Sequence, residues 1–158
     1  MLPKLKIRLI WIGKAKQKFT KEATDLYLKR LKHYAKIEVV ELKDVKASSS
    51  RTQKEKEAKL FEKYVEKGAY SICLDEKGKE YTSIGLSKMI ASLQNQSTKE
   101  INIIIGGAFG FQSSILEKAN AKWSLSQLTL PHDMCRILLT EQLYRSFTIL
   151  NNEKYHNP

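Results

Sequence analysis

The stretch EINIIIGGAFGF, residues 100–111, decides the fold. Its first six residues are almost continuously aliphatic, which is typical of a strand buried on both faces of a sheet. Such strands occur in parallel sheets that helices cover on both sides. Gly106, Gly107 and Gly110 follow at once and indicate a tight turn. The stretch therefore predicts a central parallel strand with a glycine-rich turn at its carboxyl end.

Strand and helix patterns alternate on both sides of this stretch. Period-two or short apolar runs predict strands at 5–12, 37–42 and 70–74, with a turn at 75–79, and apolar residues at helical spacing predict helices at 21–33, 52–67 and 83–93. Polar residues at the expected helix starts, Thr20, Ser113 and Asp133, are predicted to be N-caps. The alternation predicts the α/β class, with residues 1–158 forming a single domain: a mostly parallel sheet with helices on both faces.

Composition favours a soluble protein of the reducing cytoplasm. No run approaches the ~18 apolar residues that span a bilayer, and the N-terminus has no export signal. Cys73 and Cys135 lie far apart in apolar runs, so they lack the spacing of a zinc site. We find no catalytic motif for a metal and expect neither metal nor membrane binding.

The net charge of +11 is concentrated in one half of the chain. Residues 1–68 carry 19 Lys and Arg against 9 Asp and Glu, whereas residues 69–158 carry 9 against 8. A one-sided basic excess is what a phosphate backbone attracts. A solvated lysine-rich surface is the alternative interpretation.

The glycine-rich turn matches neither common nucleotide motif. Ile105 occupies the position where a dinucleotide fingerprint needs its first glycine, and no Gly-Lys-Ser/Thr follows for a phosphate loop. Paired glycines at the end of a central strand still let a ligand approach the backbone closely. The alternative is a turn that needs glycine only for its geometry.

The C-terminal quarter, WSLSQLTLPHDMCRILLTEQLYRSFTI at 123–149, places a loop before an unusually apolar helix. Apolar residues surround that helix, so one side packs on the sheet and the rest predicts a second subunit. Glu141 and Arg145 lie one turn apart and are spaced to pair. They and Arg136 also fit ordinary surface charges. His132 suits proton transfer, but a histidine after a proline is more often structural.

These residues resemble the ribosomal RNA large subunit methyltransferase H family of small SPOUT enzymes, on IIIGGAFGF, on the 123–149 stretch and on KYH at 154–156. The resemblance implies an α/β fold whose C-terminal region forms a trefoil knot, and a homodimer. It also implies transfer of a methyl group from S-adenosylmethionine to N3 of a pseudouridine in large-subunit ribosomal RNA, on the assembled ribosome.

The resemblance implies the cofactor contacts, whereas the catalytic and RNA-binding residues are candidates of our own. His132 and His156 are the candidates for proton removal, and Arg136, Arg145 and Tyr155 for holding RNA or shaping the pocket across the dimer. The implied cofactor contacts are Leu74, Gly106, Leu125, Ser126, Gln127, Leu128, Thr129 and Leu130. This chain departs from the family pattern in its long Lys-rich N-terminal segments and in the two residues after KYH.

Two other functions remain open. One is a SPOUT methyltransferase that acts on transfer RNA or on another ribosomal site. The other is a non-catalytic RNA-binding or ribosome-associated factor that keeps the fold without the cofactor. Binding of S-adenosylmethionine separates the second from the enzymes, and the modified nucleotide separates the enzymes from each other.

Overall fold

The aliphatic run at the centre of the chain forms strand β4 (Glu100–Ile105), and its residues from Ile101 to Ile105 are all buried. In the computed structural model, which describes residues 4–158, this strand lies inside a parallel sheet of order β2-β1-β4-β3-β5. The other strands are β1 (Lys6–Ile12), β2 (Lys36–Leu42), β3 (Tyr70–Glu80) and β5 (Ala121–Ser124). The predicted α/β class with a parallel sheet is confirmed.

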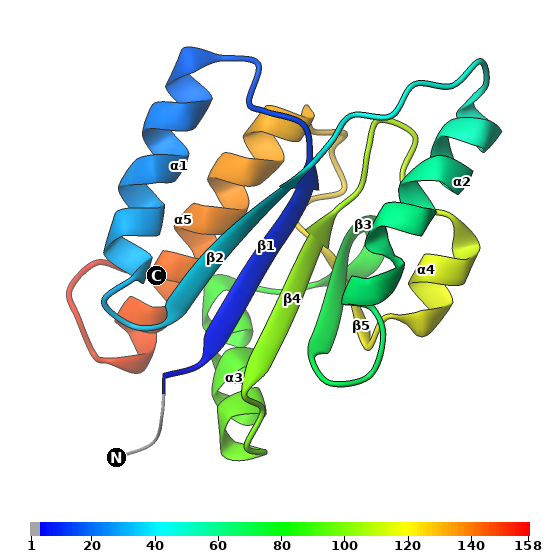
Figure 1. Ribbon diagram of the computed structural model, residues 1–158. Helices are drawn as coiled ribbons and strands as arrows, with labels where there is room; N and C mark the ends of the chain where they lie inside the picture. The colour runs from blue at the N-terminus through cyan, green and yellow to red at the C-terminus, as the bar shows by residue number, and fades with distance from the viewer. Residues whose placement is uncertain (1–3) are drawn as a thin grey trace.

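Helices cover the two faces of the sheet unequally (Figure 1). On one face lie α1 (Lys18–Leu31), α3 (Ser83–Asn95) and α5 (His132–Leu150), which bury residues such as Leu31, Ile90 and Leu143 against the larger apolar core. On the other lie α2 (Ser50–Phe61), followed by a short 3-10 turn (Glu62–Tyr64), and α4 (Ser113–Lys118). Phe61 and Ile115 belong to the smaller core on that side.

The chain crosses the sheet after β5. This strand lies at one edge, beside β3, whereas α5 packs against α1 and α3. The connecting residues 125–131 therefore pass over the carboxyl ends of the strands. Parallel α/β sheets bind ligands at these ends, where the strand order reverses. The β1–β4 neighbour pair marks such a reversal here.

The predicted turn at 75–79 is wrong, because β3 continues to Glu80. The strand makes an irregularity between Leu74 and Lys79 and pairs with β5 on both sides of it. Gly78 permits this, since a Cβ there would lie 2.6 Å from the backbone carbon of Lys122. The close backbone approach, and not a chain reversal, is what this glycine provides.

All three predicted N-caps are also wrong. Gln17, Gln112 and Pro131 precede α1, α4 and α5, so the polar residues lie inside the helices they were expected to cap. The reason is clear for Asp133, whose carboxylate accepts hydrogen bonds from the backbone N–H groups of Lys16 and Gln17 at 3.0 Å and from the Thr20 hydroxyl at 2.8 Å. It holds the segment that leads into α1 from a distant part of the chain.

Candidate active site

A first cleft of about 410 Å³ lies at the carboxyl ends of β3 and β4. One wall is the glycine-rich turn after β4, and the other is the loop after β5 that the sequence singled out. Its lining residues include all but one of the predicted cofactor contacts, namely Leu74, Gly106, Leu125, Ser126, Leu128, Thr129 and Leu130. Gln127 belongs to the same loop and is exposed, but is not part of the lining.

Gly106 and Gly110 of the glycine-rich turn are glycine for different reasons. Gly106 is buried, and a Cβ there would approach the Phe111 ring to 3.1 Å. Gly110 has a φ of 79°, in the left-handed region that side chains rarely adopt, and its N–H donates to the Gly107 carbonyl at 3.1 Å. The turn therefore keeps its backbone close to the cleft with Phe111 beside it.

The opposing loop is held by its own serines. The Ser124 hydroxyl donates to the Ser126 carbonyl at 3.0 Å, and the Ser126 hydroxyl accepts from the N–H of Leu128 at 3.0 Å. Leu128 is 73% exposed, and across the cleft Phe109 is 55% exposed. The cleft is therefore lined by backbone that hydrogen bonds hold in place, and exposed apolar side chains lie at its rim. This arrangement suits a ligand with an apolar ring and a polar edge.

His132 stands at the end of this cleft as a neutral hydrogen-bond donor. Arg136 Nε donates to its Nδ1 at 3.1 Å, and because arginine only donates, the proton of the neutral ring sits on Nε2. Burial, with the Arg136 charge adding to it, lowers the pKa of His132 to about 4. The Nε2 atom is buried, and no hydrogen bond of ordinary geometry satisfies it among the described residues, although the nearby Gly106 backbone partly offsets the lowering of the pKa.

Arg136 is buried, so its interpretation as an ordinary surface charge is wrong. It is only 2% exposed, and its guanidinium lies over the Trp11 ring, 4.8 Å from the centroid. It donates to the carbonyls of Ile12 at 2.8 Å and Gly13 at 3.0 Å. Burial lowers its pKa, but these acceptors and the stacked ring hold the cation. Arg136 thus fixes His132 against the end of β1.

A second cleft of about 840 Å³ adjoins the first. The two share Gly107, Ala108, Leu130 and His132 as lining residues. The second cleft extends past the ends of β1 and β2 to α2, where it is lined by Glu57, a buried carboxylate that sequence analysis missed. The charge pattern of α2 is typical of a solvated helix, so no signal in the sequence marks this residue.

The remaining predicted residues form a separate cluster near the C-terminus. Arg145 pairs with Glu141, Nη2 to Oε1, at 2.6 Å, which confirms the predicted pair. The Tyr155 hydroxyl donates to the same carboxylate at 3.0 Å, and Arg145 Nη1 lies 3.1 Å from His156 Nδ1. Burial and the Glu141 hydrogen bond raise the pKa of Tyr155. The cluster joins a base, an acid, a phenol and an imidazole.

This cluster lies far from His132 within one chain. Arg145 is thirteen residues further along α5, which corresponds to about 20 Å at 1.5 Å per residue. The structure thus brings together the predicted cofactor residues with His132 and Arg136, and separately Arg145, Tyr155 and His156.

Within residues 4–158, no group of three or more His, Cys, Asp or Glu residues is arranged to hold a metal ion. None of the helices in the same range is long and apolar enough to cross a bilayer.

Comparisons with known proteins agree with this architecture. Residues 5–156 match the family described as "Predicted SPOUT methyltransferase". The chain is 39% identical over 153 residues to "Ribosomal RNA large subunit methyltransferase H" of Pelobacter propionicus, covering 97% of this chain and 100% of the relative. It is 41% identical over 156 residues to the protein of the same name from Parabacteroides distasonis, covering 97% and 99%.

Solved structures extend the comparison to the fold. A probable methylase family protein from Haemophilus influenzae Rd KW20 aligns with a TM-score of 0.57 at 14% identity, over 100% of this chain and 72% of the other. A probable rRNA-methyltransferase from Porphyromonas gingivalis aligns with a TM-score of 0.51 at 14% identity, over 95% and 71%. On the full-length sequence matches, this chain belongs to the ribosomal RNA large subunit methyltransferase H family of SPOUT methyltransferases.

Proposed function

We propose that this protein transfers a methyl group from S-adenosylmethionine to N3 of a pseudouridine in large-subunit ribosomal RNA, as a homodimer acting on the assembled ribosome in the cytoplasm. The observation that carries the proposal is the pair of adjoining clefts that meet at His132. A methyltransferase needs one site for the donor and one for the acceptor, in contact at the reacting atoms. The names of the full-length relatives support ribosomal RNA as the acceptor.

The first cleft fits S-adenosylmethionine. Its volume of about 410 Å³ and its aliphatic lining suit an adenine ring between Leu74, Leu125 and Leu130. The backbone groups of the loop after β5 can then hydrogen-bond the polar edge of the adenine. Asp75 and Glu76, which also line this cleft, can accept hydrogen bonds from the ribose hydroxyls. When bound, the cofactor supplies a methyl group already activated on a sulfonium, so the protein has to align the acceptor and manage its proton.

We assign different tasks to the two predicted catalytic histidines. His132 is neutral and presents a donor, which suits it to polarise a carbonyl of the acceptor base. His156 is the candidate for proton uptake. Arg145 engages its Nδ1 here, so the guanidinium has to turn toward an RNA phosphate before that nitrogen is free to accept.

A homodimer joins the two halves of this proposed site. The 20 Å between His132 and Arg145 along one helix, estimated from about 1.5 Å per residue, is too far for a single pocket. Arg145, Tyr155 and His156 of the partner subunit would then contact the RNA held beside the cofactor cleft, with Tyr155 of the partner subunit available for stacking. The trefoil knot implied by the family belongs to the same proposal. The passage of residues 125–131 across the strand ends, from the edge strand β5 to a helix packed on α1, supports it.

The test is methyl transfer from labelled S-adenosylmethionine to intact ribosomes, free large subunits and bulk transfer RNA, with the modified nucleotide located by mass spectrometry. We expect label at one large-subunit pseudouridine and more transfer to intact ribosomes than to free subunits. Label in transfer RNA would keep the enzyme class and move the substrate. Absence of both transfer and cofactor binding by calorimetry would leave a non-catalytic ribosome-associated factor.

A further inference from the structure

Two residues that line the second cleft, Glu57 and His132, carry a buried polar atom that no ordinary hydrogen bond from the described residues satisfies. Within residues 4–158, the buried side-chain nitrogen and oxygen atoms without a hydrogen-bond partner are Trp11 Nε1, Glu57 Oε1 and His132 Nε2. Glu57 and His132 line the second cleft, and Trp11 lies under Arg136, which lines it too. A buried polar group without a partner is costly, so native structures contain few of them. Glu57 and His132 therefore leave one acceptor and one donor unsatisfied among the residues that form this cleft.

Glu57 is held in place for such a role. It is 3% exposed in the last turns of α2, and its Oε2 accepts from Gln53 Nε2 at 2.9 Å. Its carboxylate packs against Gly107, where any Cβ would collide with it. Gln53 also donates to the Val45 carbonyl. The protein thus holds Oε2 of Glu57 by a hydrogen bond, whereas Oε1, in a residue that lines the cleft, has no partner among the described residues.

The electrostatic surroundings of Glu57 are mixed. Burial raises its pKa and the nearby Asp44 carboxylate adds to the effect, whereas the Gln53 hydrogen bond opposes it. The other charged groups that line the cleft are Lys14, Lys16 and Asp133 from the β1–α1 loop and α5, together with Arg136. Asp133 and Arg136 already hold protein partners, so Glu57 keeps acceptor capacity for a ligand.

The order of the groups along the two clefts matches one kind of nucleobase edge. In the proposed function the first cleft holds the cofactor, while His132, whose Nε2 is a donor, lines both clefts and Glu57, whose Oε1 is an acceptor, lines only the second. A base that receives a methyl group on a ring nitrogen from the first cleft therefore presents a carbonyl to His132. Beyond the carbonyl it presents a second ring N–H to Glu57.

Pseudouridine carries that edge and uridine does not. In pseudouridine N3–H, the C2 carbonyl and N1–H are consecutive, because the ribose is attached through carbon. In uridine N1 carries the ribose and has no hydrogen. We propose that Glu57 accepts the N1–H of the target base and that His132 donates to its C2 carbonyl, so that Glu57 makes the enzyme select pseudouridine over uridine. This inference rests on the proposed pseudouridine N3 activity.

The test compares two substrates that differ only at the target nucleotide. Ribosomes are prepared with pseudouridine at that position, or with uridine from cells that lack the matching pseudouridine synthase. The catalytic efficiency kcat/KM is measured on both for the wild type, Glu57→Ala and Glu57→Gln. Glu55→Gln is the matched control, since Glu55 lies on the same helix and pairs with Arg51 on its outer side.

We expect the wild type to prefer pseudouridine and Glu57→Ala to lose about 10-fold or more of that preference, the value of one hydrogen bond to a charged group. In Glu57→Ala, kcat/KM should fall on the pseudouridine substrate. Its kcat/KM on the uridine substrate and its cofactor affinity should stay within about 3-fold of the wild-type values. Glu57→Gln retains an acceptor oxygen of the same reach and should keep an intermediate preference. Glu55→Gln should behave as the wild type.

Three results would overturn the inference and remain distinguishable. Equal loss on both substrates would make Glu57 a structural support of the Gly107 turn. A wild type that methylates both substrates equally would remove Glu57 as a selector and leave the ribosomal RNA activity standing. A wild type that methylates neither would refute the proposed function itself. If Glu57→Ala unfolds, the near-isosteric Glu57→Gln and Gly107→Ala, whose Cβ displaces the carboxylate, separate the same outcomes.

Discussion

Gly106 sets how closely a ligand can approach the backbone of the first cleft. A Cβ there would meet the Phe111 ring at 3.1 Å, so any side chain has to displace a ring that lines the space we assign to the cofactor. We expect Gly106→Ala to weaken S-adenosylmethionine binding by about 1 kcal/mol and Gly106→Val to abolish it, as for overpacked sites. Calorimetric titration measures both.

The matched control for Gly106 is Gly85→Ala in α3. A Cβ at Gly85 also meets a neighbour at 3.1 Å, the Thr82 hydroxyl, but this site is not part of either cleft. The control should bind the cofactor as the wild type does. Unchanged affinity in Gly106→Val would show that the cofactor does not occupy this cleft.

His132 makes stability depend on pH. Its pKa is about 4 in the folded protein, against about 6.5 in an unfolded chain. Between these values the unfolded chain binds a proton that the folded one does not. The free energy of unfolding therefore falls as the pH drops through this window, by up to about 3 kcal/mol.

We expect the free energy of unfolding of His132→Asn, measured with urea, to fall less than that of the wild type between about pH 7.5 and about pH 4.5. This expectation concerns the change with pH and does not depend on the stability of the variant at about pH 7.5. Glu57, whose pKa is raised, contributes in the opposite direction but is common to both proteins and cancels in the difference. His33→Asn, at an exposed position of the surface, is the control and should leave the slope unchanged. Parallel slopes for His132→Asn and the wild type would mean that the imidazole titrates alike in the folded and unfolded states.

Among the elements, α1 and α5 are joined by the Asp133 carboxylate in addition to their apolar packing. Asp133 in α5 accepts from two backbone N–H groups and one hydroxyl at the start of α1, and these bonds outweigh burial, so its pKa is lowered. Asp133→Ala should lower the free energy of unfolding by about 2 kcal/mol, because it removes three hydrogen bonds to a charged carboxylate. Asp25→Ala, which breaks only an exposed pair with Lys21, should cost below about 0.5 kcal/mol. Equal costs in denaturant titrations would contradict the tie between the helices.

The elements also show how far sequence reasoning reaches. The run at 100–105 and the spacing on α1 and α3 are local signals, so these strands and helices were predictable to within a few residues. Asp133 looks locally like a cap for its own helix, yet a segment more than a hundred residues away uses it. The charge pattern of α2 predicts a solvated Glu57, but in the folded chain the Gly107 backbone lies against its carboxylate and the residue is buried. The residues that we propose as cofactor contacts could be proposed only through family resemblance, since their cleft forms from segments that are far apart in the sequence.

At the scale of the whole molecule, exposed apolar side chains mark the proposed dimer interface. Phe19 at the start of α1 is 55% exposed and Met134 at the start of α5 is 37% exposed, and both border the second cleft. Exposed apolar residues that cluster in this way favour association. We expect the double variant Phe19→Asp, Met134→Asp to sediment as a monomer where the wild type sediments as a dimer. Ile84→Asp, at a 41% exposed position on α3, is the control and should stay dimeric. A double variant that remains dimeric would place the interface elsewhere.

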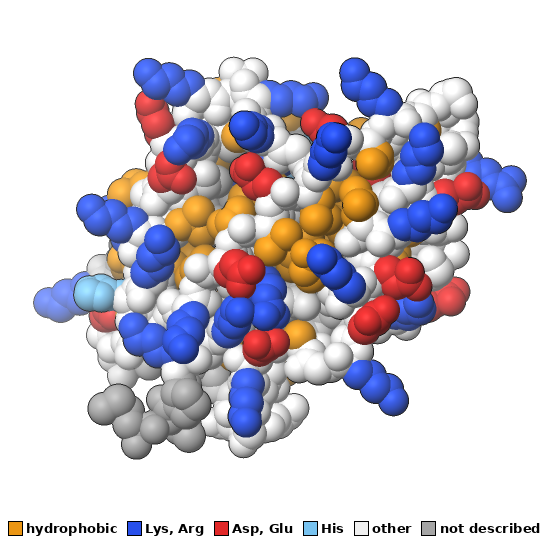
Figure 2. Space-filling view, viewed as in Figure 1, with side chains coloured by type: hydrophobic (Ala, Val, Ile, Leu, Met, Phe, Trp, Pro, Cys, Tyr) orange, Lys and Arg blue, Asp and Glu red, His pale blue; other side chains and the backbone are white. Residues whose placement is uncertain are grey.

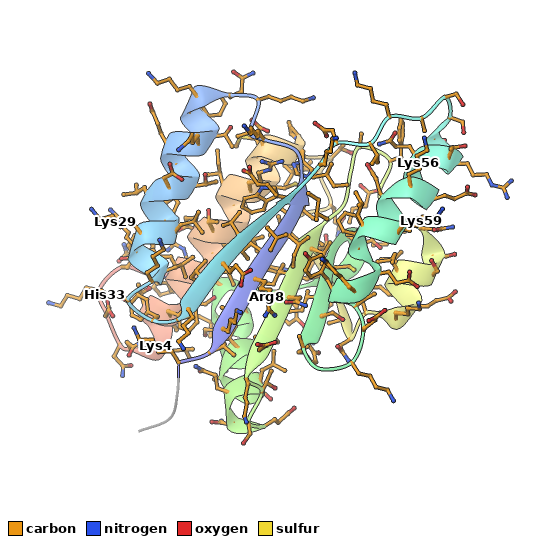
Figure 3. The ribbon with its side chains drawn as sticks, in the orientation of Figure 1. Lys4, Arg8, Lys29, His33, Lys56 and Lys59 are labelled. Atoms are coloured by element: carbon orange, nitrogen blue, oxygen red, sulfur yellow. The ribbon has the colours of Figure 1, made fainter. Side chains whose placement is uncertain are left out.

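The uneven charge of the molecule predicts where ribosomal RNA binds. Lysines and arginines surround an apolar patch on the face formed by β1, β2 and α2 (Figure 2). Lys29 extends from α1, and Lys56 and Lys59 from α2, on opposite sides of that face (Figure 3). Each phosphate contact releases counterions. For single strands, the logarithm of the binding constant therefore falls by about 0.7 per contact for each tenfold rise in salt concentration. Reversing these three lysines to glutamate should therefore reduce the salt slope of ribosome binding by up to about 2.

Net charge alone would give a different result, and one control separates the two explanations. Reversing Lys77, Lys88 and Lys122, which are also exposed but belong to the neutral half, changes the total charge by the same amount. If RNA lies on the basic face, only the first triple variant loses slope, because only those lysines exchange counterions for phosphates. If the charge acts only by long-range attraction, both triple variants bind more slowly than the wild type, and their salt slopes are equal to each other. Ribosome binding measured over a range of roughly 50 to 300 mM salt therefore decides whether the basic half is a binding surface or a solvated one.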